Sequence, residues 1–445
     1  MNNLSRLLIL LLIFTSVFQA QSQQGFSLKP SQKAFKLPAL QSFVFAKSGN
    51  YWLLMGGRTN GFHGFGSATN FPFKKANKFI YAYNTATNQL DSLAAANLPV
   101  VLREQYTSSN MQHFQVGNYL YVSGGYGEFH AKLPDSTWTT YSTLSRVNIS
   151  TMINAIVTKN KNQFIASVVY AKDPLTASTG GEMYKLPDGK FYLVLGHRFM
   201  GMYNASFSNP KIQTYLDSVH VFKLAETPTS ISIINSSRQY ISDNKPDSVT
   251  QFRRRDLLVV PAILKGGKEV GLTVYGGVFT SGTNAPFRNP IYLKGGLTPS
   301  YQLDNSYTQT SNIYATANTT MYDAQNDVML TTAFGGIGTN TTTDADGFTK
   351  SIMTISKNNK TNVTKQINNL TGTPTYMGSE SIFITAPSIP KYNTQYDIIN
   401  YNALPVGKPV LIGYIYGGIV SNSPSWGSSN PTFPTNMVYE VYFTK

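Results

Sequence analysis

Acidic side chains that stand just before apolar, strand-like segments are the first candidates for chemistry in this sequence. Only 21 of the 445 residues are Asp or Glu, yet a carboxylate recurs at this position in four separate segments. Paired carboxylates can serve as acid and base or as acid and nucleophile in glycoside chemistry. The residues of this first set are Arg103, Glu104, Glu182, Arg255, Asp256 and Glu380.

A second set of candidates lies where apolar segments end in glycine and long polar loops begin. The loops 59–77, 199–217 and 421–436 hold aromatic residues between Gly, Asn and Pro. Aromatic side chains held in this way on loops are typical of a contact surface. The residues of this second set are Arg58, Phe62, His63, Phe65, His197, Arg198 and Trp426.

Both sets also have a plainer interpretation. Carboxylates and arginines can form ion pairs that tie neighbouring segments together, and aromatic residues in long loops can pack on one another. The five histidines show no metal-ligand spacing, and no phosphate loop, nucleophile elbow or dinucleotide fingerprint stands out. The sequence therefore predicts no metal site and no cofactor, assigns no catalytic residue and leaves enzymatic activity open.

The elements that must position these residues are repeats of one phrase, an apolar β-rich run that ends in two glycines or a close variant. Strands of about five residues bounded by Gly, Asn and Asp are typical of an all-β fold. The glycines remove side chains where inner strands converge. The six copies are YWLLMGG ending at Gly57, YLYVSGG at Gly125, FYLVLGH at His197, GLTVYGG at Gly277, LTTAFGG at Gly336 and IGYIYGG at Gly418.

At these residues the chain resembles the kelch family of β-propellers. The best match runs from Lys78 to Gly125, with a strand, a turn, LP, LREQY, another strand and GNYLYVSGG. The tryptophan usual on the fourth strand of a kelch repeat is absent, and Leu90 and Leu93 stand in its neighbourhood. The resemblance implies an all-β, six-bladed propeller whose first strands surround a central channel, so that both candidate sets converge at one mouth of that channel.

One ring of six blades accounts for the whole length after the first residues. Residues 150–179 are interpreted as an insertion in the second unit. An N-terminal strand in the last blade would close the ring and remove an open sheet edge. The expected blades are 39–100, 101–178, 179–250, 251–308, 309–372 and 373–445 together with 26–37.

Residues 1–22 predict an export signal. Arg6 supplies the positive start, the run from Leu7 to Phe18 is apolar, and Ala20 to Ser22 offers a small-residue cleavage site. The run is shorter than the about 20 residues that a helix needs to span a bilayer. We therefore expect a soluble, exported protein of a bacterial envelope, in the periplasm or at the cell surface.

The absence of cysteine excludes disulfides, thiolate metal sites and a lipid anchor made through a thiol, so the protein is not expected to be a lipoprotein. It also excludes a copper site of the galactose-oxidase type, which uses a tyrosine cross-linked to cysteine and belongs to propellers of this general kind. The other propeller chemistries, sugar mutarotation and glycoside hydrolysis, stay open.

The formal net charge of +15 favours anionic partners. Export argues against nucleic acid, so an acidic glycan or a protein of the envelope is the expected partner. The leading hypothesis is a non-catalytic interaction module that presents its aromatic loops to a protein of an outer-membrane or surface complex. The alternative is a glycan-binding or glycan-modifying propeller, of mutarotase or glycosidase type, with a ring of carboxylates and arginines at the channel mouth.

Overall fold

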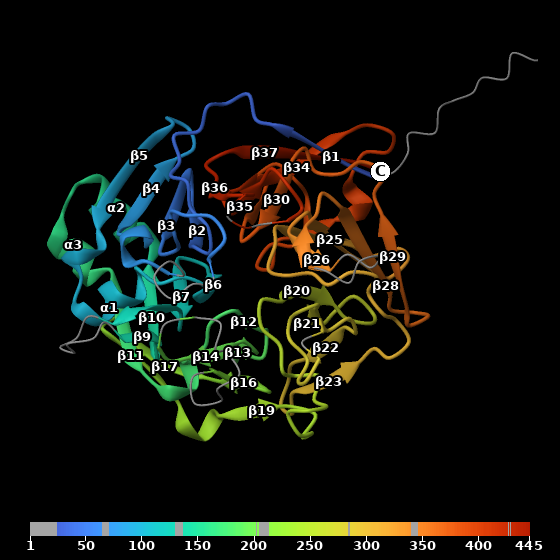
Figure 1. Cartoon of the computed structure of the whole chain (residues 1–445), viewed down its shortest axis with the longest axis horizontal. Coiled ribbons are helices and arrows are strands. Elements are labelled where there is room, and N and C mark those ends of the chain that lie inside the picture. Colours follow the sequence, from blue (N-terminus) through green and yellow to red (C-terminus); the bar gives the residue numbers. More distant parts are fainter. Residues whose placement is uncertain are drawn as a thin grey trace, which may run out of the picture.

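The computed structural model describes residues 25–64, 71–129, 137–201, 203, 213–283, 285–339, 346–425, 427 and 429–445, and within them the chain is all-β. Five four-stranded sheets and one six-stranded sheet follow one another along the chain. Figure 1 shows that these sheets are arranged around a common centre. The predicted export segment, 1–22, lies outside the described residues. No helix of the described part is long and apolar enough to cross a membrane.

The first three sheets are antiparallel, and their strands are hydrogen-bonded in chain order. The first consists of β2 (Val44–Ser48), β3 (Tyr51–Met55), β4 (Phe79–Asn84) and β5 (Gln89–Ala94). The second consists of β6 (Gln112–Val116), β7 (Tyr119–Ser123), β10 (Thr143–Asn148) and β11 (Val168–Lys172). The third consists of β12 (Glu182–Lys185), β13 (Phe191–Val194), β16 (Val219–Phe222) and β19 (Gln239–Ile241).

The next two sheets repeat this order, and the last one combines the two ends of the described chain. The fourth consists of β20 (Leu258–Ile263), β21 (Val270–Tyr275), β22 (Ile291–Lys294) and β23 (Ser300–Leu303). The fifth consists of β24 (Asn318–Asp323), β25 (Val328–Phe334), β28 (Ile352–Asn358) and β29 (Val363–Asn368), extended by β33 (Ile398–Asn400) and β32 (Lys391–Asn393). The sixth consists of β31 (Ile382–Thr385), β34 (Val410–Tyr416), β37 (Val438–Thr444) and β1 (Gly25–Pro30).

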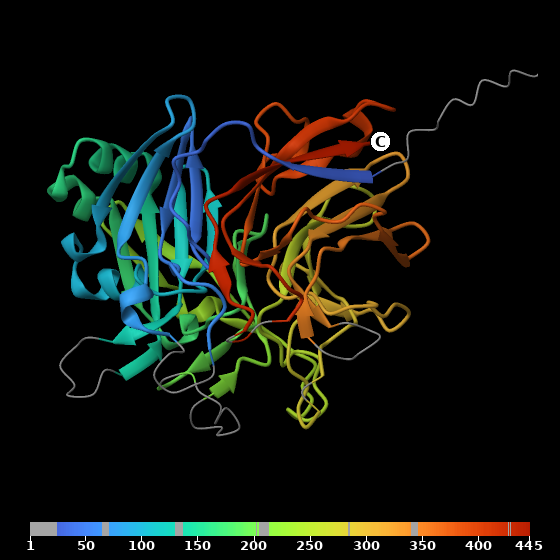
Figure 2. The ribbon, with the colours of Figure 1, turned by 45° about the horizontal axis from the view of Figure 1, so that its top comes forward.

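Smaller sheets and short helices lie beside these six sheets. Short hairpins and one three-stranded sheet lie near the lower end of the view in Figure 2. Their strands are β8 (Tyr126–Phe129), β9 (Thr137–Thr140), β14 (His197–Phe199), β15 (Gln213–Tyr215), β26 (Ile337–Thr339), β27 (Asp346–Phe348), β30 (Tyr376–Ser379), β35 (Ile419–Ser421) and β36 (Thr432–Pro434), and a further hairpin is formed by β17 (Leu224–Thr227) and β18 (Ser230–Ile233). The helices are α1 (Val100–Gln105), α2 (Ile149–Val157) and α3 (Lys161–Ala166), with short 3-10 turns at Phe73–Lys75, Ala95–Asn97, Pro174–Thr176, Asn235–Ser237 and Tyr401–Ala403.

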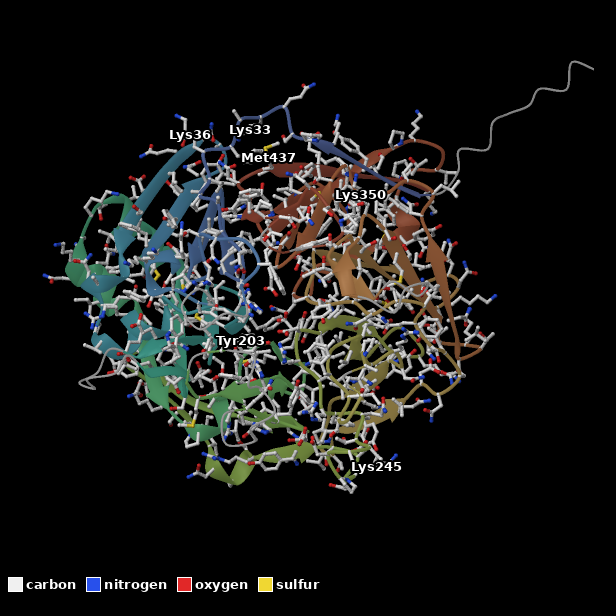
Figure 3. The ribbon with its side chains drawn as sticks, in the orientation of Figure 1. Lys33, Lys36, Tyr203, Lys245, Lys350 and Met437 are labelled. Atoms are coloured by element: carbon white, nitrogen blue, oxygen red, sulfur yellow. The ribbon has the colours of Figure 1, made fainter. Side chains whose placement is uncertain are left out.

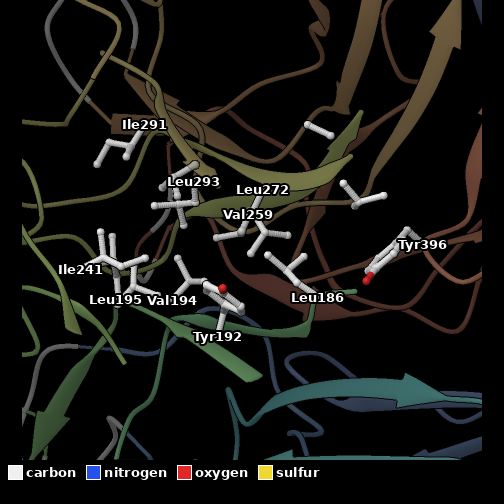
Figure 4. Packing of buried hydrophobic residues seen from close by; sticks show 14 of the residues in the cluster. Leu186, Tyr192, Val194, Leu195, Ile241, Val259, Leu272, Ile291, Leu293 and Tyr396 are labelled. Atoms are coloured by element: carbon white, nitrogen blue, oxygen red, sulfur yellow. The ribbon is translucent and has the colours of Figure 1, made fainter. Parts of the chain in front are cut away.

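Some strands are buried on both faces, whereas others are exposed. Every residue of β13, β20 and β21 is buried, while β23 is mostly exposed. A strand without a polar face must be covered on both sides, so each sheet has to pack face to face with its neighbours. Figure 4 shows such packing between the third and fourth sheets, where Val194 of β13 lies in one apolar cluster with Val259 of β20 and Leu272 of β21.

Apolar clusters lie between sheets that are consecutive along the chain. One cluster combines residues of the first and second sheets with α2, and others join the second to the third and the fifth to the sixth. A further cluster joins the first sheet to the last one, because Trp52 and Leu54 of β3 pack with Ile384 and Tyr416. α2 fills the space beside the first sheet, so the segment 150–179 is part of this packing.

The glycine pairs lie where one sheet meets the next. The N–H of Gly57 donates to the carbonyl of Ser108, and the N–H of Gly125 donates to the carbonyl of Ser178. Both carbonyls belong to the segment that leads into the first strand of the next sheet. Gly124 has φ +67°, and a Cβ atom there would lie 1.9 Å from the Ser178 carbonyl oxygen. The same contact joins the last unit to the first, since Gly418 N–H donates to the carbonyl of Leu40.

The structure corrects the alignment of the third repeat. Gly196 donates its N–H to the carbonyl of Arg254, as Gly57, Gly125, Gly336 and Gly418 do to a carbonyl of the next unit. Leu195 takes the place of the first glycine and adopts φ +60°. His197 therefore does not replace a glycine, and it is equivalent to Arg58 and Tyr126, which directly follow their glycine pairs.

The last sheet uses both ends of the described chain. β1 pairs antiparallel with β37, with Phe26 opposite Phe443 and Leu28 opposite Val441. Phe26 is buried, and its ring lies 5.4 Å from the Phe334 ring and 4.9 Å from the Phe443 ring, measured between centroids.

The connection between β31 and β34, residues 386–409, contacts all five other large sheets. Asp397 forms an ion pair with Lys47 at 2.7 Å, and Gln395 donates to the carbonyl of Gln115. The Tyr396 hydroxyl donates to the carbonyl of Lys185, and the Tyr392 hydroxyl donates to that of Gly267. β33 pairs in parallel with β24 of the fifth sheet.

Candidate functional site

A ring of residues with left-handed backbone precedes the first strands. Five of the six large sheets carry such a residue two positions before that strand, with φ between 50° and 67°. Asn and Asp tolerate this conformation, but it is uncommon for Glu, and backbone strain of this kind gathers at functional sites. The residues are Ser42, Asn110, Gly180, Asp256 and Glu380.

The residue before each of these is bridged to a residue that follows a glycine pair. Gln41 pairs with Arg58, Ser109 with Tyr126, Thr179 with His197 and Arg255 with Val278. These bridges bring the approaches to the first strands beside the starts of the long loops. Residues of the two sequence sets are thereby brought together at one end of the molecule.

Two cavities meet at this ring. The larger one, of about 540 Å³, is lined mainly by first strands and by the segment 394–397, and it includes Glu182, His113 and Lys47. The smaller one, of about 270 Å³, is lined by loop residues and by residues next to the glycine pairs. Ser42, Asn110, Asp256 and Glu380 line both cavities, so they stand at the boundary between them.

The wall of the smaller cavity is aromatic. His63 stacks on Phe62 and on Phe71, with ring centroids 4.5 and 5.0 Å apart, and meets the edge of Tyr203 at 4.9 Å. Figure 3 places Tyr203 toward the middle of the molecule, whereas Lys33, Lys36 and Lys245 lie at the perimeter. The other rings of the wall belong to Tyr126, Phe199, Phe279 and Tyr314.

Arg58 enters this wall directly after its glycine pair. It is 3% exposed, and its guanidinium lies 5.0 Å from the centroid of the Phe71 ring. Nε donates to Asn60 Oδ1 and Nη2 donates to the carbonyl of Pro72, both at 3.0 Å. Burial lowers the pKa of Arg58 to about 10, because the charged form loses its hydration.

Arg255 and Asp256 form a buried ion pair at the boundary of the two cavities. The remaining Arg255 donors reach the hydroxyls of Tyr215 and Tyr203, each at 3.2 Å. Burial raises the pKa of Asp256, and the neighbouring guanidinium opposes this effect. The pair joins consecutive residues, so it neutralises both charges within one segment, and the contact with the third unit comes from the hydrogen bonds to Tyr215 and Tyr203.

Glu182 and Glu380 are different, because no arginine or lysine neutralises them within the described part of the chain. Burial raises the pKa of Glu182 to about 8, and the nearby Glu380 charge adds to the shift. Burial likewise raises the pKa of Glu380 to about 7, helped by Asp256 and opposed by a 2.8 Å hydrogen bond from the Ser42 hydroxyl. Near neutral pH these carboxyls can donate or accept a proton.

The two histidines of the smaller cavity are neutral near pH 7. Burial lowers the pKa of His63 to about 4. Burial also lowers the pKa of His197, with Arg255 adding to the shift, and Gln213 Nε2 lies 2.6 Å from its Nδ1. Among the described residues, no group of three or more His, Asp or Glu side chains is arranged to hold a metal ion.

Three predicted residues lie away from both cavity walls. Arg103 and Glu104 belong to α1, where Glu104 is buried near Tyr141. The structure forms a helix at LREQY because Leu102 packs in the cluster between the first two sheets, so this segment does not lead straight into β6. Arg198 donates to the carbonyls of Ala177 and Pro174 instead of facing the cavity.

Of the remaining candidates, Phe65 and Trp426 lie outside the described residues. The smaller cavity brings together Arg58, Phe62, His63, His197, Arg255, Asp256 and Glu380. Sequence reasoning did not single out Ser42, Asn110 or Tyr126. Tyr126 has the same position after its glycine pair as Arg58, and that spacing was the signal that could have identified it.

No family model matches the chain, and no curated protein matches it. A solved structure described as the structure of YjhT is similar to the chain, with 11% sequence identity and a TM-score of 0.47. The match covers 90% of this chain and 99% of that one.

Proposed function

We propose that the protein is an exported, kelch-like six-bladed β-propeller that binds a sugar-type ligand in the smaller cavity. The propeller is supported by six large sheets in succession, by clusters between consecutive sheets and by the packing of the first sheet on the last. Export is supported by the composition of residues 1–22. The proposed blades keep the limits expected from the repeats, and β33 and β32 of the last one extend the fifth sheet.

The single observation that carries the binding function is the aromatic cavity bounded by polar groups of both signs. Aromatic faces pack against the C–H faces of a sugar ring, while carboxyl groups and arginines bind its hydroxyls. The volume of about 270 Å³ is close to the lower end of small-molecule sites, which is roughly 300 Å³. This favours a single small ligand over an extended polymer.

The aromatic loop residues face inwards, and this bears on the choice between the two functions. Phe62, His63, Phe71 and Tyr203 pack on one another and line the cavity, so these four described residues do not form a broad exposed rim. Aromatic loops that enclose a space serve a small ligand better than a flat protein partner.

The test is isothermal titration calorimetry with monosaccharides and short glycans, for the native protein and for Tyr203→Ala. We expect saturable binding that Tyr203→Ala weakens at least about tenfold, because a stacking surface is removed. Tyr240→Ala is the matched control, since Tyr240 is 60% exposed and lies outside the cavity. Absence of binding to the whole panel would contradict the proposal.

Docking on an envelope protein is the second candidate, and one observation favours it. Met200 is 61% and Phe433 is 49% exposed, and both adjoin segments that line the smaller cavity. We expect pull-down from solubilised envelopes to recover a stoichiometric partner, and the double variant Met200→Ser with Phe433→Ser to lose it. A native protein that stays monomeric and without a partner rejects this function.

A further inference from the structure

Arg58 carries a buried charge that nothing in the described structure neutralises. Its two hydrogen bonds go to neutral oxygens, those of Asn60 and Pro72, and the guanidinium makes no ion pair within the described residues. Burying a charge away from a counter-ion is costly, so such a group is normally paired. Within the described residues, Nη1 and one N–H of Nη2 have no acceptor.

A second buried arginine also makes no ion pair within the described residues, but it differs in its hydrogen bonds. Arg254 is fully buried, and its donors reach the carbonyls of Gln251, Gly276 and Asn289 and the side-chain oxygen of Gln251. Arg254 lines neither cavity, so its hydrogen bonds are structural. Arg58 differs in both respects, because it lines the smaller cavity and retains free donors.

The smaller cavity is lined by charged groups of both signs. Glu380 accepts a hydrogen bond from the Ser42 hydroxyl and forms no ion pair within the described residues. Asp256 is already paired with Arg255. A ligand in this cavity therefore meets one uncompensated cation at Arg58 and carboxyl groups at Glu380 and Asp256.

The chemistry of the free donors selects a carboxylate. The planar guanidinium edge binds the two oxygens of a carboxylate through parallel N–H bonds, and one positive charge neutralises one negative charge. A phosphate monoester carries up to two charges, and the second would remain unpaired beside Glu380 and Asp256. Hydroxyl groups suit the carboxyl pole, because they can donate to Glu380 and Asp256.

We propose that the ligand is a sugar acid, and that Arg58 binds its carboxylate while the ring lies against the aromatic wall. This deepens the proposed function and rests on it. Arg58 is then the residue that determines specificity for acidic over neutral sugars.

The first experiment uses the native protein alone. Calorimetry compares galacturonate, glucuronate and mannuronate with their methyl esters and with the parent hexoses. The esters keep the shape of the acids and lose the charge. We expect at least one acid to bind at least about tenfold more tightly than its ester and its parent hexose. Equal affinity for acid, ester and hexose overturns the inference and leaves the proposed function intact. Failure of every sugar to bind overturns both.

The second experiment locates the preference. Arg58→Gln is expected to bring the affinities for acid and ester within about twofold of each other, since the charge is gone. Arg198→Gln is the matched control, because Arg198 also bonds through Nε and Nη2 to oxygens but lies outside the cavity wall. Circular dichroism verifies that both variants are folded. An acid preference that survives in folded Arg58→Gln overturns the assignment to Arg58, and the comparison of acid with ester in the native protein stands even where that variant does not fold.

Discussion

Individual side chains at the centre of the molecule divide into paired and unpaired charges, and this division decides what each of them does. Arg255 and Asp256 neutralise each other and add rigidity. Glu182 and Glu380 have no cationic partner among the described residues, so they hold protons at unusually high pH. The sequence presents all four as similar candidates, and only the three-dimensional arrangement separates them.

The buried carboxyls predict a pH dependence of stability. Glu380 has an ordinary pKa of 4.5 when unfolded and about 7 when folded, so the folded state binds more protons between these values. The contribution of Glu380 to the free energy of unfolding is therefore fully present below about pH 4.5 and is lost as the pH rises through 7. We expect Glu380→Gln, relative to the native protein, to gain at least about 2 °C in melting temperature between pH 5 and 8.

The comparison of variant with native protein isolates this effect. His63 and His113 have lowered pKa values, of about 4 each, and act in the opposite direction below pH 6.5. Glu269→Gln is the control, because Glu269 forms an exposed ion pair with Lys294 and lines neither cavity. A constant difference for Glu380→Gln would contradict the prediction.

The Arg255–Asp256 pair predicts non-additive losses of stability. Arg255→Met leaves a buried carboxylate without its partner, and Asp256→Asn leaves a buried guanidinium, so each is expected to cost about 3–5 kcal/mol. The double variant is expected to lose clearly less than the sum, because neither charge is then stranded. Urea denaturation of the four proteins measures the coupling, and strict additivity would show that the pair does not interact.

At the scale of elements, the contacts between sheets are made by backbone at the glycine pairs. A Cβ at Gly124 would lie 1.9 Å from the Ser178 carbonyl oxygen, whereas at Gly117 nothing lies within 4 Å. Both glycines have positive φ, of +67° and +56°. The two positions therefore share the conformational cost of a side chain and differ only in crowding.

This contrast predicts different costs for the same substitution. Gly117→Ala is expected to destabilise the protein by about 1 kcal/mol, which is the cost of the left-handed conformation. Gly124→Ala is expected to cost at least about 3 kcal/mol, because the second sheet must also move away from the third. Chemical denaturation measures both, and equal losses would refute the close contact.

The elements also show what could be predicted from the sequence. An all-β fold followed from the recurring β-rich runs and glycine pairs. The alignment at Leu195 could not be predicted, because a leucine adopts there the conformation that glycine favours. The helix at LREQY was missed, because its six residues are stabilised by burial of Leu102 and not by a helical pattern.

The candidate site could be predicted only in part for a related reason. The end of an apolar run brought Arg58 and His197 into consideration, although the sequence alignment placed His197 at the second glycine and not after the pair. Ser42 and Asn110 carry no such mark, and their role depends on the path of the backbone before the first strands. Spacing does not reveal whether an arginine is paired, since Arg255 pairs with the adjacent Asp256 and Arg146 pairs with Glu226, 80 residues away.

At the scale of the whole molecule, the last sheet links the two ends of the described chain. Phe26 of β1 is buried against Phe334 of the fifth sheet and Phe443 of the last one. Loss of this side chain thus affects two sheets that are separated from it by most of the sequence.

We predict that Phe26→Ala lowers the free energy of unfolding by about 3–5 kcal/mol, as expected for a large buried aromatic side chain. Phe79→Ala, at a position that is 44% exposed, is expected to cost about 1 kcal/mol or less. Tryptophan fluorescence during denaturation is the measurement, and it reports on the first sheet through Trp52. An unchanged midpoint in Phe26→Ala would show that β1 is dispensable.

The segment 386–409 has a consequence for how this fold can evolve. Repeat proteins commonly change length when whole repeats are duplicated or lost. Here a single connection of the last sheet bonds to Lys47, Gln115, Lys185 and Gly267, each in a different sheet, and pairs with β24 of the fifth. Adding or deleting one sheet would shift these partners out of reach. The connection therefore opposes the gain or loss of a whole repeat, whereas single residues of each repeat can still be substituted.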